Sequence, residues 1–317
     1  MSRPSTPPSL HPRTVAEAAA ILRAGRVCAF PTETVYGLGA DATNADAVLS
    51  IYETKARPRF NPLIVHCADL AMAEKLAEFP PLAREAAKLW PGPLTLVLKA
   101  KQGNGLADVV MAGLDSVGIR IPAHPLARKL IAAVGRPLAA PSANPSGKLS
   151  PTSAQQVRKG FDDRVPVLDG GPCMAGVEST ILRIEGDTLV QLRAGALARE
   201  DIEAALGRKV SLAGKEAGIA APGMMLSHYA PRARMRLNAE PMAGEAYLAF
   251  GPAPDFAGPM RNLSPAGDLR EAARNLFAML HELDAQGMEC IAVAPVPETG
   301  LGEAINDRLT RAAAPRG

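Results

Sequence analysis

The segment "KARPRFNPLIVH", residues 55 to 66, carries side chains that could bind an oligophosphate. Lys55 and Arg57 are alternate cations just before a short apolar run. Asn61 and His66 lie on either side of the turn into that run. Arginine offers a fork of N–H donors and lysine a mobile point charge, so the two can converge on one phosphate chain. The segment also fits a solvated basic loop, and a histidine that closes an apolar strand is commonly a core residue.

A second polar segment, "PTETVYGLGADA" at residues 31 to 42, follows the apolar run "VCAF". Thr32 and Thr34 place two hydroxyls close to the end of that run. "GLGADA" fits the dinucleotide fingerprint G-x-G-x-x-A, but six residues separate its first glycine from Phe30, and the fingerprint requires that glycine directly after the strand. The sequence also lacks G-x-x-x-x-G-K-[ST], so we expect no P-loop.

Two further stretches place polar groups beside apolar strands. "APSANPSG", residues 140 to 147, brings Ser142 and Asn144 directly after such a strand. Ligands bind at the strand ends of open α/β sheets, although the same string is also typical of an ordinary turn. Arg120, which isoleucines flank in "VGIRIP", is either a snorkelling side chain or a clamp for a ligand carboxylate.

Composition excludes several classes of protein. Aromatic residues make up only 4%, and 35 basic residues face 32 acidic ones, which argues against a stacking-based single-strand binder. The four cysteines form no CxxC pair, so we expect neither zinc nor disulfides. Since no stretch approaches the roughly 20 apolar residues of a membrane span, and no signal-peptide region is visible, we expect a cytoplasmic protein without membrane contact. No Ser-His-Asp, HExxH or paired-carboxylate pattern supports hydrolase chemistry.

The elements that position these groups alternate between helix and strand. Thr14 and Glu17 form a capping box at the start of one helix, and a second helix begins near Asn44 and runs to Lys55. Further helices are expected around 71–89 and 125–135, and strands at 27–30, 63–67, 94–100, 117–122 and 137–144. Residues 179–193 form two alternating runs around a Gly-Asp pair, which indicates a hairpin. The alternation predicts an α/β sheet of mixed direction.

The chain is long enough for two domains, and its pattern changes twice. We expect a Pro- and Ser-rich tail over 1–13, a large domain over 14–210, a linker without sustained periodicity over 211–236, and a small domain over 237–317. Within the small domain the pattern predicts strand 245–251, helix 268–287, strand 290–297 and a helix near 303–313.

Taken in order, these strings resemble the YrdC-like family of threonylcarbamoyl-AMP synthases, in the two-domain form. The matching strings are "FPTETVYGLGADA", "KARP" with "NPLIVH", "WPGPLTLVL", "VGIRIP", "APSANPSG", "GVESTIL", "LRAGAL" and "PGM" with "HYAP". They cover nearly all of residues 14 to 231, and the K-x-R and S-x-N signatures are intact. The resemblance implies a YrdC-like twisted mixed sheet with flanking helices and a small C-terminal α/β, Rossmann-like domain.

The activity that the resemblance implies is that of a nucleotidyltransferase. L-threonine, bicarbonate and ATP, with Mg²⁺ bound to the ATP, would form L-threonylcarbamoyladenylate and pyrophosphate. The product would pass to a tRNA threonylcarbamoyl transferase, which modifies tRNA adenosine, and a weak tRNA contact would be in keeping with this role. The protein's part is placement of the reactants and neutralisation of charge. No general base and no metal ligand is assigned.

The resemblance also assigns roles to individual residues. Lys55 and Arg57 would be catalytic, because they neutralise the departing pyrophosphate. The expected ATP-binding residues are Lys55, Arg57, Asn61, Ser116, Ser142, Asn144, Ser150, Arg193, His228 and Tyr229. The expected threonine-binding residues are Thr32, Thr34, His66, Arg120, Ala140 through its backbone, and Ser179. Arg120 would pair with the substrate carboxylate.

The segment "PGMMLSHYAP", residues 222–231, resembles a family segment that lies across the mouth of the site. It would act as a lid that excludes water from a labile adenylate, with His228 and Tyr229 close to the nucleotide.

Two other functions stay open on the sequence. One is a double-stranded RNA or tRNA-binding module without turnover, in which a basic concave face grips the phosphate backbone. The other is regulatory nucleotide binding without chemistry.

Overall fold

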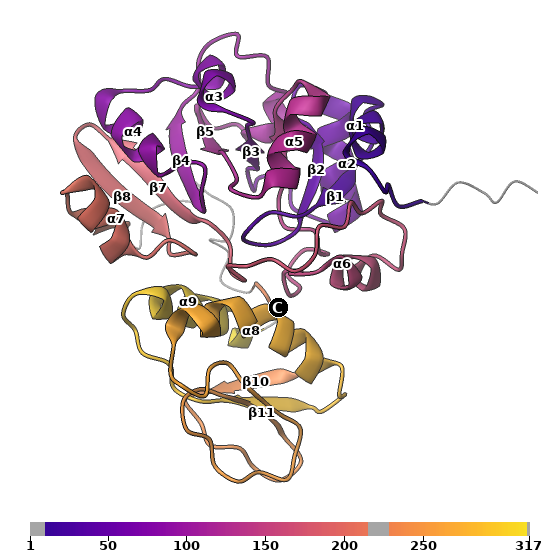
Figure 1. The fold of residues 1–317 in the computed structure, drawn as a ribbon, viewed down its shortest axis with the longest axis vertical. Helices are drawn as coiled ribbons and strands as arrows, with labels where there is room; N and C mark the ends of the chain where they lie inside the picture. The colour runs from indigo at the N-terminus through magenta and orange to yellow at the C-terminus, as the bar shows by residue number, and fades with distance from the viewer. Residues whose placement is uncertain (1–9, 215–227, 316–317) are drawn as a thin grey trace, which may run out of the picture.

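The computed structural model describes residues 10–214 and 228–315, which form two α/β domains, each built on its own sheet (Figure 1). Residues 1–9 of the expected tail and 215–227 of the expected linker and lid lie outside the described residues. The larger domain contains helices α1 (Val15–Arg23), α2 (Ala45–Lys55), α3 (Leu70–Leu76), α4 (Pro81–Ala86), α5 (Pro125–Val134), α6 (Ala154–Gly160) and α7 (Arg199–Leu206), with 3₁₀ turns η1 (Ala87–Leu89) and η2 (Asp108–Val110).

Nine strands form the sheet of the larger domain. They are β1 (Cys28–Phe30), β2 (Gly37–Asp41), β3 (Ile64–His66), β4 (Leu94–Lys99), β5 (Ser116–Arg120), β6 (Leu138–Ala139), β7 (Thr180–Glu185), β8 (Thr188–Arg193) and β9 (Val210–Leu212). Their spatial order is β1-β2-β6-β3-β5-β4-β7-β8-β9. The pairs β3–β5, β4–β7 and β8–β9 are parallel and the other neighbours antiparallel, which confirms the predicted mixed sheet.

Local sequence signals account for the elements that carry the polar segments. The side chain of Asn44 accepts the N–H of Ala47 and so caps α2, which ends at Lys55. Ala56 then adopts a left-handed conformation with φ of 50°, which ends the helix and turns Arg57 away from its axis. The predicted hairpin is confirmed as well, since β7 and β8 pair antiparallel around a Gly-Asp turn.

The smaller domain has a four-stranded parallel sheet covered by two helices. Its elements are β10 (Arg234–Leu237), β11 (Ala246–Ala249), β12 (Met260–Asn262), α8 (Leu269–Asp284), β13 (Cys290–Val293) and α9 (Leu301–Ala313). The strand order is β10-β13-β11-β12. The expected boundary at 236 falls inside β10, and the expected linker also includes β9. β10 reads "RMRL", which alternates polar and apolar residues over only four positions of a half-exposed edge strand, so the run is too short to mark a strand by itself.

The two domains meet through the helices of the smaller one, which lie between its sheet and the larger domain (Figure 1). Val35 and Val177 of the larger domain belong to the same apolar cluster as Leu276 and Phe277 of α8. Gly176 permits this approach, because a Cβ at this residue would lie 2.4 Å from the carbonyl oxygen of Ala273 in α8. The domain interface is therefore packed as a core and not as a loose surface contact.

The four cysteines are free thiols, and Cys28, Cys67 and Cys173 are buried. Burial raises the pKa of Cys28 to about 12, so its thiol stays protonated and unreactive.

Within residues 10–214 and 228–315, no helix combines the length and the apolar character that crossing a membrane requires.

Candidate active site

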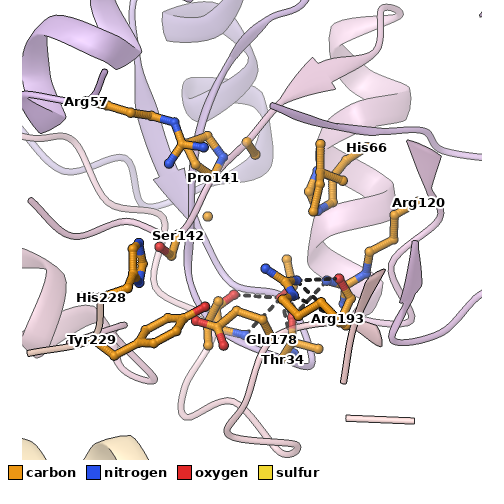
Figure 2. A pocket seen from close by; sticks show the side chains of 16 residues that line it. Thr34, Arg57, His66, Arg120, Pro141, Ser142, Glu178, Arg193, His228 and Tyr229 are labelled. Carbon is orange, nitrogen blue, oxygen red and sulfur yellow. Dashed lines mark hydrogen bonds between the residues drawn. The ribbon is translucent and has the colours of Figure 1, made fainter. Parts of the chain in front are cut away.

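A cavity of about 50 Å³ lies in the larger domain, where the loops after β1 and β6 meet the segment at 228–231 (Figure 2). Its lining comes from eight stretches of the chain: Thr32, Thr34, Val35, Gly37, Arg57, Ile64, His66, Arg120, Ala140, Pro141, Ser142, Glu178, Ser179, Arg193, His228 and Tyr229. This volume holds about three or four water molecules, so the lining must move apart to admit a nucleotide.

Eleven of the sixteen predicted site residues line this cavity: Thr32, Thr34, Arg57, His66, Arg120, Ala140, Ser142, Ser179, Arg193, His228 and Tyr229. Five predicted residues do not line it: Lys55, Asn61, Ser116, Asn144 and Ser150. The sequence thus brought together residues that lie up to 197 positions apart, but some of its candidates point elsewhere.

The two threonine hydroxyls form a chain that ends on Arg120. Thr32 Oγ1 donates to the carbonyl oxygen of Val35 at 2.6 Å, and it lies 2.8 Å from Thr34 Oγ1. Because Thr32 has one hydroxyl proton and uses it on Val35, Thr34 must donate to Thr32. Thr34 Oγ1 in turn accepts from Arg120 Nη1 at 2.9 Å. A ligand group that binds Thr34 Oγ1 must therefore be a donor.

Glu33 holds Arg120 in place and was missing from the sequence prediction. Glu33 Oε1 accepts from Arg120 Nη2 at 2.7 Å, and the carbonyl oxygen of Gly92 accepts from Arg120 Nε at 3.3 Å. Burial would raise the pKa of Glu33, but the charge of Arg120 and its hydrogen bond hold it below its ordinary value. Three of the five N–H donors of Arg120 are used in these contacts and in the bond to Thr34, and two can face a ligand.

Two buried histidines face the cavity as neutral rings. Burial, followed by the nearby charge of Arg120, lowers the pKa of His66 to about 3. Burial likewise lowers the pKa of His228 to about 3. Among the described residues, Nδ1 of each ring is buried without a hydrogen-bond partner. Both imidazoles can therefore offer a hydrogen bond to a ligand, but neither supplies a positive charge at neutral pH.

Arg57 and Arg193 are oriented by backbone carbonyls. Arg57 Nη2 donates to the carbonyl oxygen of Pro62 at 3.0 Å, and Arg193 Nη2 donates to that of Ser179 at 2.8 Å. Burial lowers the pKa of Arg57 to about 10, so the guanidinium keeps its charge at neutral pH. A carbonyl orients a guanidinium without cancelling its charge, so both side chains can attract a phosphate.

Lys55 supports the loop after β6 instead of lining the cavity. Its Nζ donates to the carbonyl oxygens of Ser142 at 2.6 Å and Asn144 at 2.5 Å. Burial, followed by the charge of Arg57, lowers the pKa of Lys55 well below its ordinary value. The K-x-R spacing thus separates the two side chains, because Ala56 turns the chain between them.

The four other predicted residues outside the cavity have partners in the fold. Asn144 Nδ2 donates to the carbonyl oxygens of Pro145 and Lys148, which fixes the tight loop that carries Ser142. Ser150 Oγ donates to Glu178 Oε1 at 2.5 Å, directly behind the lining. Ser116 lines a separate cavity of about 10 Å³ beside Thr95. The backbone carbonyl of Asn61 accepts from Tyr52, so that residue buttresses the turn after α2.

Sequence reasoning also missed Glu178, a carboxylate that lines the cavity. It stands inside the quoted string "GVESTIL", so its type and place were visible there. Burial would raise the pKa of Glu178, whereas the charges of Arg308 and Arg193 hold it below its ordinary value. Arg308 belongs to α9 of the smaller domain, and its Nε donates to Glu178 Oε2 at 2.9 Å. A charged side chain of the smaller domain thus contacts a carboxylate that lines the cavity in the larger domain.

The described residues contain no group of three or more His, Cys, Asp or Glu side chains placed to hold a metal ion. Both oxygens of Glu178, the lining carboxylate, already accept hydrogen bonds. A cation that enters this site would therefore be bound chiefly by oxygen atoms of the molecule that carries it into the cavity.

Comparison with known proteins covers both domains. A family model described as telomere recombination matches residues 20–195, and one described as the C-terminal domain of threonylcarbamoyl-AMP synthase matches 197–314. The threonylcarbamoyl-AMP synthase of Bacillus subtilis is 42% identical over 324 residues, covering 95% of this chain and 93% of the relative. The chain belongs to the threonylcarbamoyl-AMP synthase family.

Other members of the threonylcarbamoyl-AMP synthase family match over nearly the same length. The protein of Pyrococcus abyssi is 42% identical and covers 93% of this chain and 92% of its own. The crystal structure of P. abyssi Sua5 complexed with L-threonine has a TM-score of 0.87 and 40% identity, over 94% of each chain. A variant of that protein, with a histidine and the next tyrosine replaced by alanine, has a TM-score of 0.84 at 38% identity, over 94% of this chain and 92% of its own. The predicted family and fold are confirmed.

Proposed function

We propose that this protein makes L-threonylcarbamoyladenylate from L-threonine, bicarbonate and ATP and releases pyrophosphate. Family membership over both domains supports this nucleotidyltransferase activity. The observation that carries the proposal is one cavity with two kinds of lining: the Thr32–Thr34–Arg120 chain, and the guanidinium groups of Arg57 and Arg193. The first suits a small amino acid and the second suits a nucleotide's phosphates.

The amino acid binds beside the hydroxyl chain. Two N–H groups of Arg120 donate hydrogen bonds to the substrate carboxylate, and Thr34 Oγ1 accepts a hydrogen bond from the substrate ammonium or hydroxyl. The N–H of Ala140 already donates to the carbonyl of Ile64, so the backbone contact of Ala140 uses its carbonyl. His66 and Ser179 complete the pocket. A shorter or apolar amino acid would leave some of these buried polar groups without a hydrogen-bond partner. The pocket therefore binds such an amino acid more weakly than threonine.

The nucleotide binds on the opposite side, where Figure 2 places Arg57 and His228, away from His66 and Arg120. Arg57, Arg193 and Ser142 hold the phosphates, with His228 and Tyr229 against the nucleotide. Lys55 contributes by fixing the loop of Ser142 and by its remaining N–H, while Asn61, Ser116, Asn144 and Ser150 reach the nucleotide only after the lining has moved apart.

The reaction needs placement more than covalent help from the protein. Threonine's neutral amine and bicarbonate form a carbamate with the loss of one water molecule, and a carbamate oxygen then attacks the α-phosphorus as the bond to pyrophosphate breaks. Arg57 and Arg193 stabilise the charge that develops on the leaving group. Mg²⁺ bound to the ATP phosphates would offset part of that charge. A closed cavity protects the adenylate from water.

Pyrophosphate release tests this function. Purified protein is incubated with ATP and Mg²⁺, with and without L-threonine and bicarbonate. Release that requires both co-substrates, together with an adenylate product by mass spectrometry, is the expected result. Affinity for double-stranded RNA or tRNA without turnover would instead support an RNA-binding module, and ATP binding without threonine dependence would support a regulatory site.

The product is a reactive mixed anhydride, so an enzyme that transfers its threonylcarbamoyl group must use it soon after release. We propose a tRNA threonylcarbamoyl transferase as that partner, with only weak contact between tRNA and this protein. Transfer of labelled threonine to tRNA in a coupled reaction, at a rate limited by the concentration of this protein, is the expected outcome.

A further inference from the structure

Arg308 is the largest fully buried side chain among the residues that the structure describes, and it lies at the interface between the two domains. Its side chain, on α9 of the smaller domain, has 0% exposure. Nε donates to Glu178 Oε2 at 2.9 Å, and Nη1 donates to the carbonyl oxygen of Ala194 at 2.8 Å, both in the larger domain. One guanidinium thus connects the helix to two segments that border the cavity.

The same guanidinium also contacts the segment that carries His228 and Tyr229. Its carbon lies 5.4 Å from the centre of the Tyr229 ring, which packs on its other neighbours His228 and Phe277 at centroid distances of 4.0 and 5.5 Å. Tyr229 has a φ of 60°, a left-handed conformation that an aromatic residue rarely adopts. Such a conformation persists only where the surroundings enforce it.

Interface stability does not explain this residue. Nη2 of Arg308 is buried without a hydrogen-bond partner among the described residues. A buried ion pair with an unpaired donor stabilises an interface no better than an apolar side chain of the same volume. Arg308 also donates to Asp307 Oδ2 of its own helix, and two of its contacts, Glu178 and Tyr229, line the cavity.

We propose that Arg308 is a positioning residue through which the smaller domain sets the shape of the active site. It fixes Glu178 from behind and holds the Tyr229 ring over the cavity. Glu178 in turn accepts from Ser150, so displacement of Arg308 disturbs two lining segments at once. The catalytic part of this inference rests on the proposed function, and the structural part does not.

Three variants separate positioning from folding. Arg308→Met keeps most of the side-chain volume and removes the hydrogen bonds. Arg308→Lys keeps a positive charge without the planar guanidinium group. Arg261→Met is the control, because it changes an exposed arginine of the same domain. Thermal unfolding shows whether each variant is folded. If Arg308→Met does not fold, Arg308→Lys provides the same comparison, because it keeps the charge.

Hydrogen exchange gives a readout that does not depend on activity. The amide of Ala230 donates to the carbonyl of Gly147, and that of His228 to the carbonyl of Arg311. If Arg308 holds this segment, these amides exchange about tenfold faster in Arg308→Met than in wild type, partly recover in Arg308→Lys, and do not change in Arg261→Met. Equal exchange in wild type and both Arg308 variants overturns the inference.

Steady-state kinetics tests the catalytic part. We expect kcat/KM for pyrophosphate release to fall by about 10- to 100-fold in Arg308→Met, with partial rescue in Arg308→Lys. A folded Arg308→Met with kcat/KM within twofold of Arg261→Met would contradict the inference. A wild-type protein without threonine-dependent release would refute the proposed function instead, and the exchange comparison would then decide this inference.

Discussion

Replacement of Thr34 by valine tests the threonine end of the cavity. Valine has nearly the same shape, so the change removes the hydroxyl and little else. The loss leaves Arg120 Nη1 without its acceptor at 2.9 Å, whereas Thr32 Oγ1 loses one donor and keeps the backbone N–H groups of Thr34 and Val35. Arg120 and Thr32 are at most 3% exposed, so only a water inside the cavity can take the place of the hydroxyl.

The size of the effect follows from the hydrogen bond that Thr34 Oγ1 accepts from the charged ammonium of bound threonine, because the bond to Arg120 is present without the ligand as well. A hydrogen bond to a charged group contributes about 1.5–3 kcal/mol, and a buried donor without a partner costs a similar amount. Since about 1.4 kcal/mol is a factor of ten, the Kd for L-threonine should rise roughly 10- to 100-fold. The Kd for ATP should stay within about twofold, because Thr34 lies on the side of the cavity away from Arg57.

Calorimetric titration of threonine and of ATP measures both constants. Thr180→Val is the matched control, since Thr180 is a fully buried threonine whose hydroxyl bonds to the carbonyl of Leu197 and does not line the cavity. Thr180→Val should lose stability and keep its threonine affinity. A Kd for threonine that is unchanged in Thr34→Val, or raised equally in Thr180→Val, would refute the reasoning.

Three more predictions concern charge, pH and the domain interface. Arg57→Met should raise the KM for ATP at least about tenfold and leave threonine affinity unchanged, and equal effects on both ligands would contradict the division of the cavity. His66 has a pKa of about 3 when folded against 6.5 ordinarily, so the unfolded chain binds the extra proton, and stability is full above pH 6.5 and falls as the pH drops. Between pH 7 and 5 this proton uptake should lower the unfolding free energy by about 2 kcal/mol, measured by urea unfolding with Trp90 fluorescence. His66→Gln should remove this contribution and leave the one from His228, whose pKa is also about 3. Gly176→Ala should lower the unfolding free energy by about 1–3 kcal/mol, because its Cβ would meet α8 at 2.4 Å, and an unchanged Tm would argue against the packed interface.

Local signals predicted most of the fold. Side-chain caps such as Asn44 and the Gly-Asp turn of the hairpin act within a few residues, so they can be read without the rest of the molecule. β10 was not predicted because four alternating residues are a weak signal, and the strand is fixed by its pairing with β13, far along the chain. Strand order across the larger sheet depends on the same long-range pairing.

The site was predictable in residue type but not in side-chain direction. Arg57 and Lys55 carry the same charge two positions apart, yet the turn at Ala56 sends only Arg57 to the cavity. Arg308 did leave a signal: it stands on the buried stripe of α9 with Ala304 and Ile305. A charged residue on an apolar stripe needs a partner, but the sequence does not say that the partner is Glu178 in the other domain.

A crystal structure with L-threonine and a non-reactive ATP analogue tests the central claim most directly. We predict that the threonine carboxylate contacts Arg120 and that the phosphates contact Arg57 and Arg193, in one continuous cavity. The alternative location is the open groove of about 630 Å³ between the domains, which Arg270 lines. Threonine or nucleotide bound in that groove, with the Arg120 pocket empty, would contradict the account.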